Sequence, residues 1–180
     1  WESALGFAVF NDKPALGAVS IADTGEIVCG GQRKTDPDSG ENANVWKLTA
    51  GDGEKVVDDC YPLDVGGLTN AVRRVVEFDG ILYAILQATA TTYQLAAFEV
   101  ATGDELARIT TTFLSDLQVD ETGVYAVIGS QIQKYPLELA GVHEWRTSGE
   151  SVTRFTISGE NQFDTVSGGR ARRIVVDPED

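Results

Sequence analysis

The sequence contains no methionine, one histidine and two cysteines among its 180 residues. Catalysis by a Ser-His-Asp or Cys-His group would therefore have to use His143, which we interpret as an ordinary strand residue between a turn and an aromatic side chain. A zinc site needs several cysteine or histidine ligands, and the two cysteines form no Cys-x-x-Cys motif. These scarce residue types argue against nucleophilic or zinc-dependent catalysis within this chain.

Basic residues are also few, with 14 Lys and Arg against 28 Asp and Glu, which gives a formal net charge of −14. Because contact with a phosphate backbone needs clustered Lys and Arg, we predict that nucleic acid is not a partner. The strongest basic cluster is Arg170, Arg172 and Arg173. We interpret it as a solvated edge strand whose charges deter further pairing, with anion or partner binding as the alternative. The many acids leave a catalytic carboxylate pair open.

Long apolar stretches are absent as well, since no run of about 18 apolar residues occurs, and this predicts no membrane-spanning helix. Cys29 and Cys60 are the two cysteines. They form either a disulfide, which would fit an oxidising compartment, or two buried free thiols. From the composition we favour an extracellular or virion location over a cytoplasmic one.

What the sequence does contain is one pattern that returns three times: an apolar strand, an Asp-Gly-type turn and a second apolar strand. The copies are Gly17–Gly30 (GAVSIADTGEIVCG), Val72–Leu86 (VRRVVEFDGILYAIL) and Leu114–Gly129 (LSDLQVDETGVYAVIG). Each is followed by a further hairpin, and these are Val45–Val57 with a turn at Ala50–Gly53, Leu95–Ile109 with a turn at Ala101–Asp104, and Ile132–Arg146 with a turn at Leu139–Gly141. Repetition at roughly 40–50 residues with four short strands per unit predicts an all-β fold of β-propeller blades, each a four-stranded antiparallel sheet.

We expect about three to four blades in residues 1–180, as a single propeller-type domain or a segment of one, with units at about 17–60, 72–110 and 114–170. Val152–Val166 is an extra hairpin-like stretch of the third unit, and residues 172–180 read as the start of a further blade. Closed propellers have about four to eight blades, so an incomplete propeller is predicted. Further blades or protein partners should cover its open edges, in an oligomer or larger complex. Because the chain begins at Trp1 and lacks methionine, we expect a segment of a larger polypeptide or a processed product.

Three segments carry motifs of a recognisable kind, and they are Val119–Gly129 (VDETGVYAVIG), Ala97–Ile109 (AFEVATGDELARI) and Leu137–Thr147 (LELAGVHEWRT). They resemble the pyrroloquinoline-quinone-type, or quinoprotein-like, propeller family, whose blades carry a Val-Asp-x-x-Gly-x-Val-Tyr turn and end in Ala-x-Thr-Gly-x-x-x-Trp. Trp145 stands at the family's tryptophan position, whereas the first two units have Val56 or Val57 and Ala107 or Arg108 there. The resemblance covers most of 17–147 and implies the fold. The family's quinone site is assigned to no residue here, so we predict no such cofactor.

One loop carries a set of oxygen-bearing side chains around a glycine, at Asp36–Asn42 (DPDSGEN). Calcium loops gather ligands in this way because the ion takes six to eight oxygens. The loop lacks the third Asp or Asn before the glycine and the Glu at the twelfth position. We interpret it as a solvated inter-strand loop, with a Ca²⁺ site at Asp36, Asp38, Gly40 and Asn42 as the alternative.

Acidic and aromatic residues recur at equivalent places in the units. Asp23, Asp79, Asp120 and Asp177 stand at the turns, where an Asp side chain satisfies backbone groups, so we predict structural roles for them. The recurring aromatic residues are predicted to pack between neighbouring blades, and they are Tyr83 and Tyr125 on one strand and Trp46, Phe98 and Tyr135 on the next.

Two functions fit these observations. The first is a non-enzymatic structural or protein-interaction propeller, a component of a large assembly such as a virion or cell-surface complex, because the repeats are intact and no catalytic residues are evident. The alternative is a fragment of a quinoprotein-type dehydrogenase or propeller hydrolase whose active site lies outside this chain.

Overall fold

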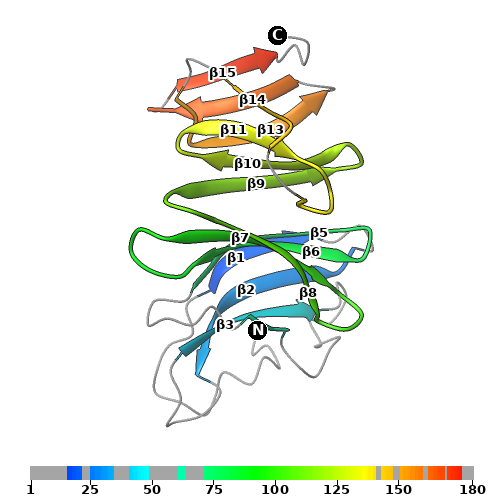
Figure 1. Ribbon diagram of the computed structural model, residues 1–180. Coiled ribbons are helices and arrows are strands. Elements are labelled where there is room, and N and C mark those ends of the chain that lie inside the picture. Colours follow the sequence, from blue (N-terminus) through cyan, green and yellow to red (C-terminus); the bar gives the residue numbers. More distant parts are fainter. Residues whose placement is uncertain are drawn as a thin grey trace.

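The computed structural model consists of strands and connecting segments, with no helix among the residues that it describes (Figure 1). These residues are 16–21, 25–34, 41–48, 61–63, 71–140, 143–147, 151–159, 162–168 and 170–175. The strands are β1 (Leu16–Ile21), β2 (Ile27–Lys34), β3 (Glu41–Leu48), β4 (Tyr61–Leu63), β5 (Ala71–Phe78), β6 (Ile81–Gln87), β7 (Tyr93–Glu99), β8 (Glu105–Thr111), β9 (Leu114–Asp120), β10 (Gly123–Ile128), β11 (Gln131–Tyr135), β12 (Trp145–Arg146), β13 (Arg154–Gly159), β14 (Gln162–Ser167) and β15 (Arg170–Val175).

The strands form four separate antiparallel sheets in which each strand pairs with the next one in the sequence. The first sheet is β1–β4, the second β5–β8, the third β9–β12 and the fourth β13–β15. Antiparallel neighbours need only a short connection, which is why the turn signals in the sequence mark these strands well. The all-β prediction is confirmed, and the predicted four-stranded antiparallel sheet is found in the first three sheets, while the fourth has three strands among the described residues.

Strand β6 is apolar along almost its whole length because both of its faces are covered. Side chains alternate between the two faces of a strand, so Leu82, Ala84 and Leu86 face the first sheet while Tyr83 and Ile85 face the third. All five side chains are essentially inaccessible to solvent. Strand β10 repeats the arrangement, with Val124 and Ala126 toward the second sheet and Tyr125 and Val127 toward the fourth.

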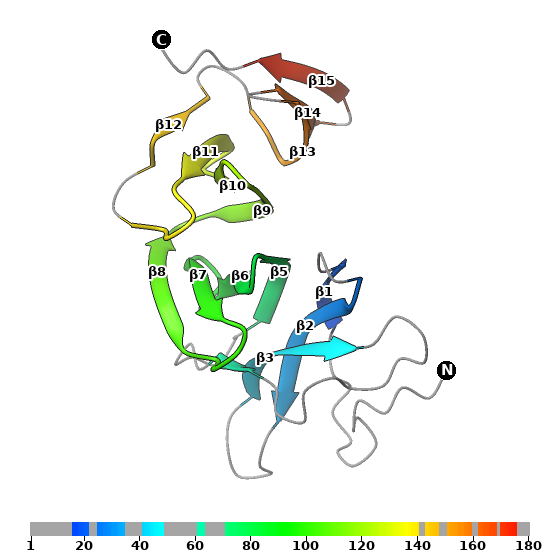
Figure 2. The ribbon, with the colours of Figure 1, turned by 90° about the vertical axis from the view of Figure 1, so that its right-hand side faces the viewer.

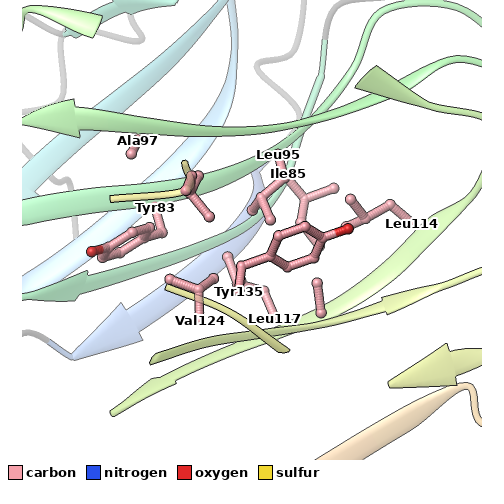
Figure 3. Close-up of a cluster of buried hydrophobic side chains, with 10 residues drawn as sticks. Tyr83, Ile85, Leu95, Ala97, Leu114, Leu117, Val124 and Tyr135 are labelled. Atoms are coloured by element: carbon pink, nitrogen blue, oxygen red, sulfur yellow. The ribbon is translucent and has the colours of Figure 1, made fainter. Parts of the chain in front are cut away.

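Three apolar clusters join the neighbouring sheets. Figure 3 shows the cluster between the second and third sheets, where Tyr83 and Ile85 lie against Leu117 and Val124. Burying one large apolar side chain contributes about 1.5–3 kcal/mol, so these interfaces are a major source of the stability of the fold. The predicted packing between sheets is confirmed for Phe98, Tyr83, Tyr135 and Tyr125, while the side chain of Trp46 lies outside the described part of the chain.

The four sheets are arranged in an open arc (Figure 2). Their first strands, β1, β5, β9 and β13, lie along the concave side, and later strands such as β8, β12 and β15 lie on the convex side. Within the described residues the arc does not close into a ring, which agrees with the predicted incomplete propeller.

Two strand assignments differ from the sequence-based prediction. The predicted hairpin Val45–Val57 puts the last strand of the first unit before residue 58, but the strand paired with β3 is Tyr61–Leu63. Pro62 lies in this strand, and proline is tolerated there because β4 is an edge strand. Arg172–Val175 does not start a further sheet. It belongs to β15, which pairs with β14 in a sheet that begins at Arg154.

The predicted turns are visible where the structure describes them. Asp79 and Gly80 both have positive φ angles, 49° and 73°, as a tight hairpin turn requires. At the next unit the Oδ1 atom of Asp120 accepts a hydrogen bond from the Thr122 backbone N–H at 2.8 Å. The structural role predicted for these acids is therefore confirmed at Asp79 and Asp120, whereas Asp23 and Asp177 lie outside the described residues.

Gly123 follows the Asp120 turn in close contact with the neighbouring strand. A Cβ atom at this position would lie 2.6 Å from the carbonyl oxygen of Tyr135. We expect Gly123→Ala to lower the free energy of unfolding by about 1–3 kcal/mol, because backbone must move to relieve the overlap. Urea unfolding followed by circular dichroism measures the change.

The matched control is Gly159→Ala, where a Cβ would make only ordinary contacts near 3.6 Å with the Gln162 side chain. This variant should be as stable as the original chain or slightly more so, since alanine loses less backbone freedom on folding. Equal destabilisation by both substitutions would show that the close approach at Gly123 is not the cause.

Candidate functional site

A groove of about 710 Å³ runs along the concave side of the arc. It is lined by the first strand of every sheet, because these four strands lie along the inside of the arc (Figure 2). The lining residues are 19–21 of β1, 74–78 of β5, 116–119 of β9 and 154–156 of β13, together with Asp164 and Val166 of β14. The groove is thus a feature of the whole arrangement of sheets.

Asp116 connects three of these strands. Its side chain is only 7% exposed, and the carboxylate lies 3.2 Å from the Arg74 guanidinium, measured from Oδ1 to Nε. The other oxygen, Oδ2, accepts a hydrogen bond from the Phe155 backbone N–H at 3.0 Å. Hydrogen bonds to a charged partner are stronger than neutral ones, and here they join β5, β9 and β13 at the groove wall.

Arg74 reaches Asp116 because β5 contains a bulge. The pairing of β5 with β6 shifts register between Val72 and Arg74, so Arg73 is the extra residue. An extra residue changes which face the following side chains occupy. Val72 and Val75, three positions apart, therefore both pack toward the first sheet, and Arg74 lies on the side of the third. The Arg73 Nε–H donates a hydrogen bond of 2.8 Å to the Gln87 side chain.

The remaining groove surface is partly apolar and partly charged. Val19 and Ile21 of β1 are 65% and 71% exposed, and Val166 of β14, at the other end of the groove, is 44% exposed. At the other end of the groove, Asp164 pairs with Arg173 at 2.8 Å, and the guanidinium holds the pKa of the carboxyl below its ordinary value. Arg154 has no ion pair within the described part of the chain.

The single histidine of the sequence lies outside the groove. His143 is not among the groove residues, and its ring contacts Tyr135 edge-on at a centroid distance of 6.1 Å. Among the residues that the structure describes, no group of three or more His, Cys, Asp or Glu side chains is placed to hold a metal ion.

The predicted calcium loop falls mostly outside the described residues. Asp36, Asp38 and Gly40 are not described, while Asn42 belongs to β3 and pairs with Arg33 of β2. The calcium site therefore stays a prediction. The disulfide does too, because Cys29 lies in β2 and Cys60 is not described.

Tyr83 connects the second sheet to the chain segment that follows β11 of the third sheet. Its hydroxyl donates a hydrogen bond of 2.9 Å to the backbone carbonyl of Leu137, which lies in the connection between β11 and β12. Burial, together with the negative charges of Glu138 and Asp79, raises the pKa of Tyr83 to about 12. The Tyr83 side chain is therefore in its neutral form in the folded chain at neutral pH.

Sequence reasoning did not identify the groove or the Asp116 contact. The signals were present, because Asp116 interrupts the apolar positions Leu114 and Leu117 and an Arg-Arg pair interrupts the apolar strand β5. Only the three-dimensional arrangement shows that these two interruptions meet.

Similar solved structures share the propeller fold. The chain matches a chain of the Mitotic Checkpoint Complex with a TM-score of 0.61 at 12% identity, over 89% of this chain and 47% of the other. It matches the Dos1 propeller with a TM-score of 0.62 at 11% identity, over 91% and 42%, and the WD40 β-propeller domain of Doa1 with 0.53 at 12%, over 89% and 54%. The chain therefore has a β-propeller fold and spans about half the length of these structures.

No protein-family model and no curated protein sequence matches the chain. The structural matches agree with the predicted resemblance to propellers as a fold, but they do not single out the pyrroloquinoline-quinone type. The described residues contain no helix that is long and apolar enough to cross a membrane.

The Asp116 contact leads to a first prediction on the site. Asp116→Asn removes the charge that Arg74 and the Phe155 N–H both face, and we expect it to lower the free energy of unfolding by about 1.5–3 kcal/mol. Chemical denaturation at neutral pH measures this loss. Asp164→Asn is the control, because that carboxylate is exposed and paired on the solvent side, and it should change stability little. A similar loss in both variants would contradict the linking role of Asp116.

Tyr83 leads to a second prediction. Its pKa is raised from 10.0 to about 12 in the folded chain, so its contribution to stability is complete below pH 10 and is lost as the pH rises toward 12. Tyr83→Phe should lower the free energy of unfolding by about 0.5–1.5 kcal/mol at pH 8, because the Leu137 carbonyl loses its donor. The variant should also show a smaller fall in stability between pH 10 and 12. Thermal melts across this pH range test both effects, and an unchanged alkaline slope would contradict the assignment.

Proposed function

We propose that the chain is a non-enzymatic protein-interaction propeller whose concave groove contacts a partner protein. The observation that carries the proposal is the groove itself, which crosses four sheets and places two exposed apolar side chains, Val19 and Ile21, at one end. Exposed apolar groups beside polar ones are typical of interaction sites. Asp116 and Asp164 are already engaged with arginines, which leaves them poorly suited to acid–base chemistry.

The comparisons support this kind of role. One similar chain comes from the structure of the Mitotic Checkpoint Complex, so that propeller is part of an assembly of proteins. Another is the WD40 β-propeller domain of Doa1. At identities of 11–12% these matches support the scaffold and leave the partner open.

The charge of the chain indicates the chemistry of the partner. A net charge of −14 repels acidic macromolecules and speeds the approach of basic ones. The partner we propose is therefore a protein whose contact surface is net positive and carries apolar side chains for Val19 and Ile21. The same charge disfavours nucleic acid, as does a groove in which acids accompany Arg74 and Arg154.

The open arc supports a place in a larger assembly. Sheet faces and edges at the ends of an arc need a cover, which further blades or a partner subunit would supply. We propose that this assembly is of the virion or cell-surface kind, with an extracellular or virion location. Native mass spectrometry of the isolated material tests the proposal, since it should show this chain within a larger complex.

The test of the groove compares two substitutions of exposed apolar residues by aspartate. Ile21→Asp changes the groove, whereas Leu106→Asp changes another exposed apolar side chain, on β8 outside the groove; the exposed fractions are 71% for Ile21 and 53% for Leu106. Both should fold normally, because surface substitutions usually cost little. The original chain and Leu106→Asp should retain the same bound protein in quantitative affinity capture from the source cells. Ile21→Asp should capture at least about tenfold less of this protein, since one buried isoleucine contributes about 1.5–3 kcal/mol to binding.

Two results would overturn the proposal. One is equal capture by Ile21→Asp and the original chain. The other is retention that does not weaken as the ionic strength rises, because attraction between an acidic chain and a basic partner is screened by salt.

A further inference from the structure

A second, smaller pocket lies on the fourth sheet, next to the hairpin that joins β14 and β15. Its volume is about 170 Å³, and its described lining residues are Ser151, Thr165, Ser167, Arg170 and Arg172. None of them lines the concave groove. The pocket is therefore a separate site, and the partner proposed for the groove does not account for it.

The pairing of β14 with β15 brings these side chains to one face of the sheet. Ser167 is paired with Arg170, and Thr165 with Arg172. Directly opposed residues of antiparallel strands share a face, and so do residues two apart in one strand. Two arginines and two hydroxyl groups thus stand together because of the register alone, and Ser151 adds a third hydroxyl from the preceding segment.

Arg173 shows what the neighbouring position does instead. It lies on the opposite face of β15, where its guanidinium makes two contacts with the Asp164 carboxylate, at 2.8 and 3.1 Å. The basic cluster of the sequence is therefore divided by the alternation of the strand. Arg173 has an acidic partner, whereas Arg170 makes no ion pair or hydrogen bond with its side chain in the described structure.

The position of the pocket is unusual for polar residues. On the same face, the next paired positions are Phe163 and Ile174, which pack against the third sheet. The face thus changes from apolar to cationic and hydroxyl-bearing within one pair of residues. The sequence-based interpretation, charges that protect an edge strand from further pairing, explains why β15 carries arginines. It does not explain why Arg170 and Arg172 line one pocket together with three hydroxyl groups.

The chemistry of the pocket suits an oxyanion. Guanidinium groups offer several N–H donors in a plane, and serine hydroxyls add O–H donors. The Thr165 hydroxyl already donates to the Arg172 carbonyl at 3.3 Å, so Ser151 and Ser167 are the available hydroxyls. Sites for whole small molecules usually measure about 300–1,000 Å³, so a pocket of this size fits a single group.

We propose that this pocket binds one phosphoryl-type oxyanion, with Arg170 as its main cationic contact and Arg172, Ser151 and Ser167 around it. The oxyanion is either free phosphate or a phosphoryl group on the side chain of another protein. Both present the same charged oxygens, and charge-assisted hydrogen bonds to arginine recognise them equally.

The test titrates inorganic phosphate into the intact chain and follows binding by calorimetry. We expect saturable binding to the original chain and about tenfold weaker binding to Arg170→Gln, because a hydrogen bond to a charged group contributes about 1.5–3 kcal/mol. Arg173→Gln is the matched control. It removes the same charge from the adjacent position of the same strand, so it should change the affinity by no more than about twofold if the pocket, and not the overall charge, holds the anion.

A further variant and a peptide pair complete the experiment. Ser167→Ala keeps the net charge and should weaken phosphate binding severalfold, which protects the result against a folding defect in Arg170→Gln. A phosphoserine peptide that binds more tightly than phosphate, while its unphosphorylated form does not bind, identifies a phosphorylated protein as the source. Equal affinity for phosphate and phosphopeptide identifies the free anion. The proposal is overturned if the original chain shows no saturable phosphate binding, or if Arg173→Gln loses as much affinity as Arg170→Gln.

Discussion

The structure depends on one constraint: the middle strands β6 and β10 are apolar on both faces, so the second and third sheets must be covered on both sides. Strand β6 meets the first sheet through Leu82 and the third through Tyr83, and β10 meets its two neighbours in the same way. Sheets that are covered on both faces stack into a series, and the twist of each sheet makes the stack curve. The concave groove follows from this curvature, because it brings the first strands together on one side (Figure 2).

Polar groups at the groove wall add hydrogen bonds between sheets that the apolar clusters already hold together. Apolar contacts hold neighbouring sheets in pairs, but the Asp116 carboxylate bonds across three sheets at once, to Arg74 on one side and Phe155 on the other. A buried carboxylate is tolerable only when its oxygens have donors, so the three strands must keep their relative positions. The bulge at Arg73 is what makes this possible, since it directs Arg74 toward the third sheet.

The sequence predicts those parts of the fold that depend on local pattern. The hairpin turn at Asp79, the strand pairs of the second and third sheets and the packing of Tyr83 and Tyr125 all follow from alternation and turn chemistry. The sequence pattern predicts a further blade from residue 172, whereas the fourth sheet starts at Arg154, because the β13–β14 hairpin lacks the repeated Asp-Gly turn. Asp116 is 42 positions from Arg74 and 39 positions from Phe155 in the sequence. Its contact with Arg74 also needs the bulge in β5, which no residue pattern predicts.

The two ends of the arc differ chemically, and this bears on where a partner binds. On the first sheet Ser20 is paired with Val28, which packs against the second sheet, so Val19 and Ile21 must lie on the opposite, uncovered face. On the fourth sheet the corresponding outer face carries the exposed Asp164–Arg173 pair together with Val166 and Val175, which are 44% and 66% exposed. Exposed apolar side chains gain from burial, whereas a solvated ion pair gains little. Both ends of the arc therefore offer apolar side chains to a partner. Ile21, at 71% exposed, is the most exposed of those that line the groove, which is why its substitution should release the partner.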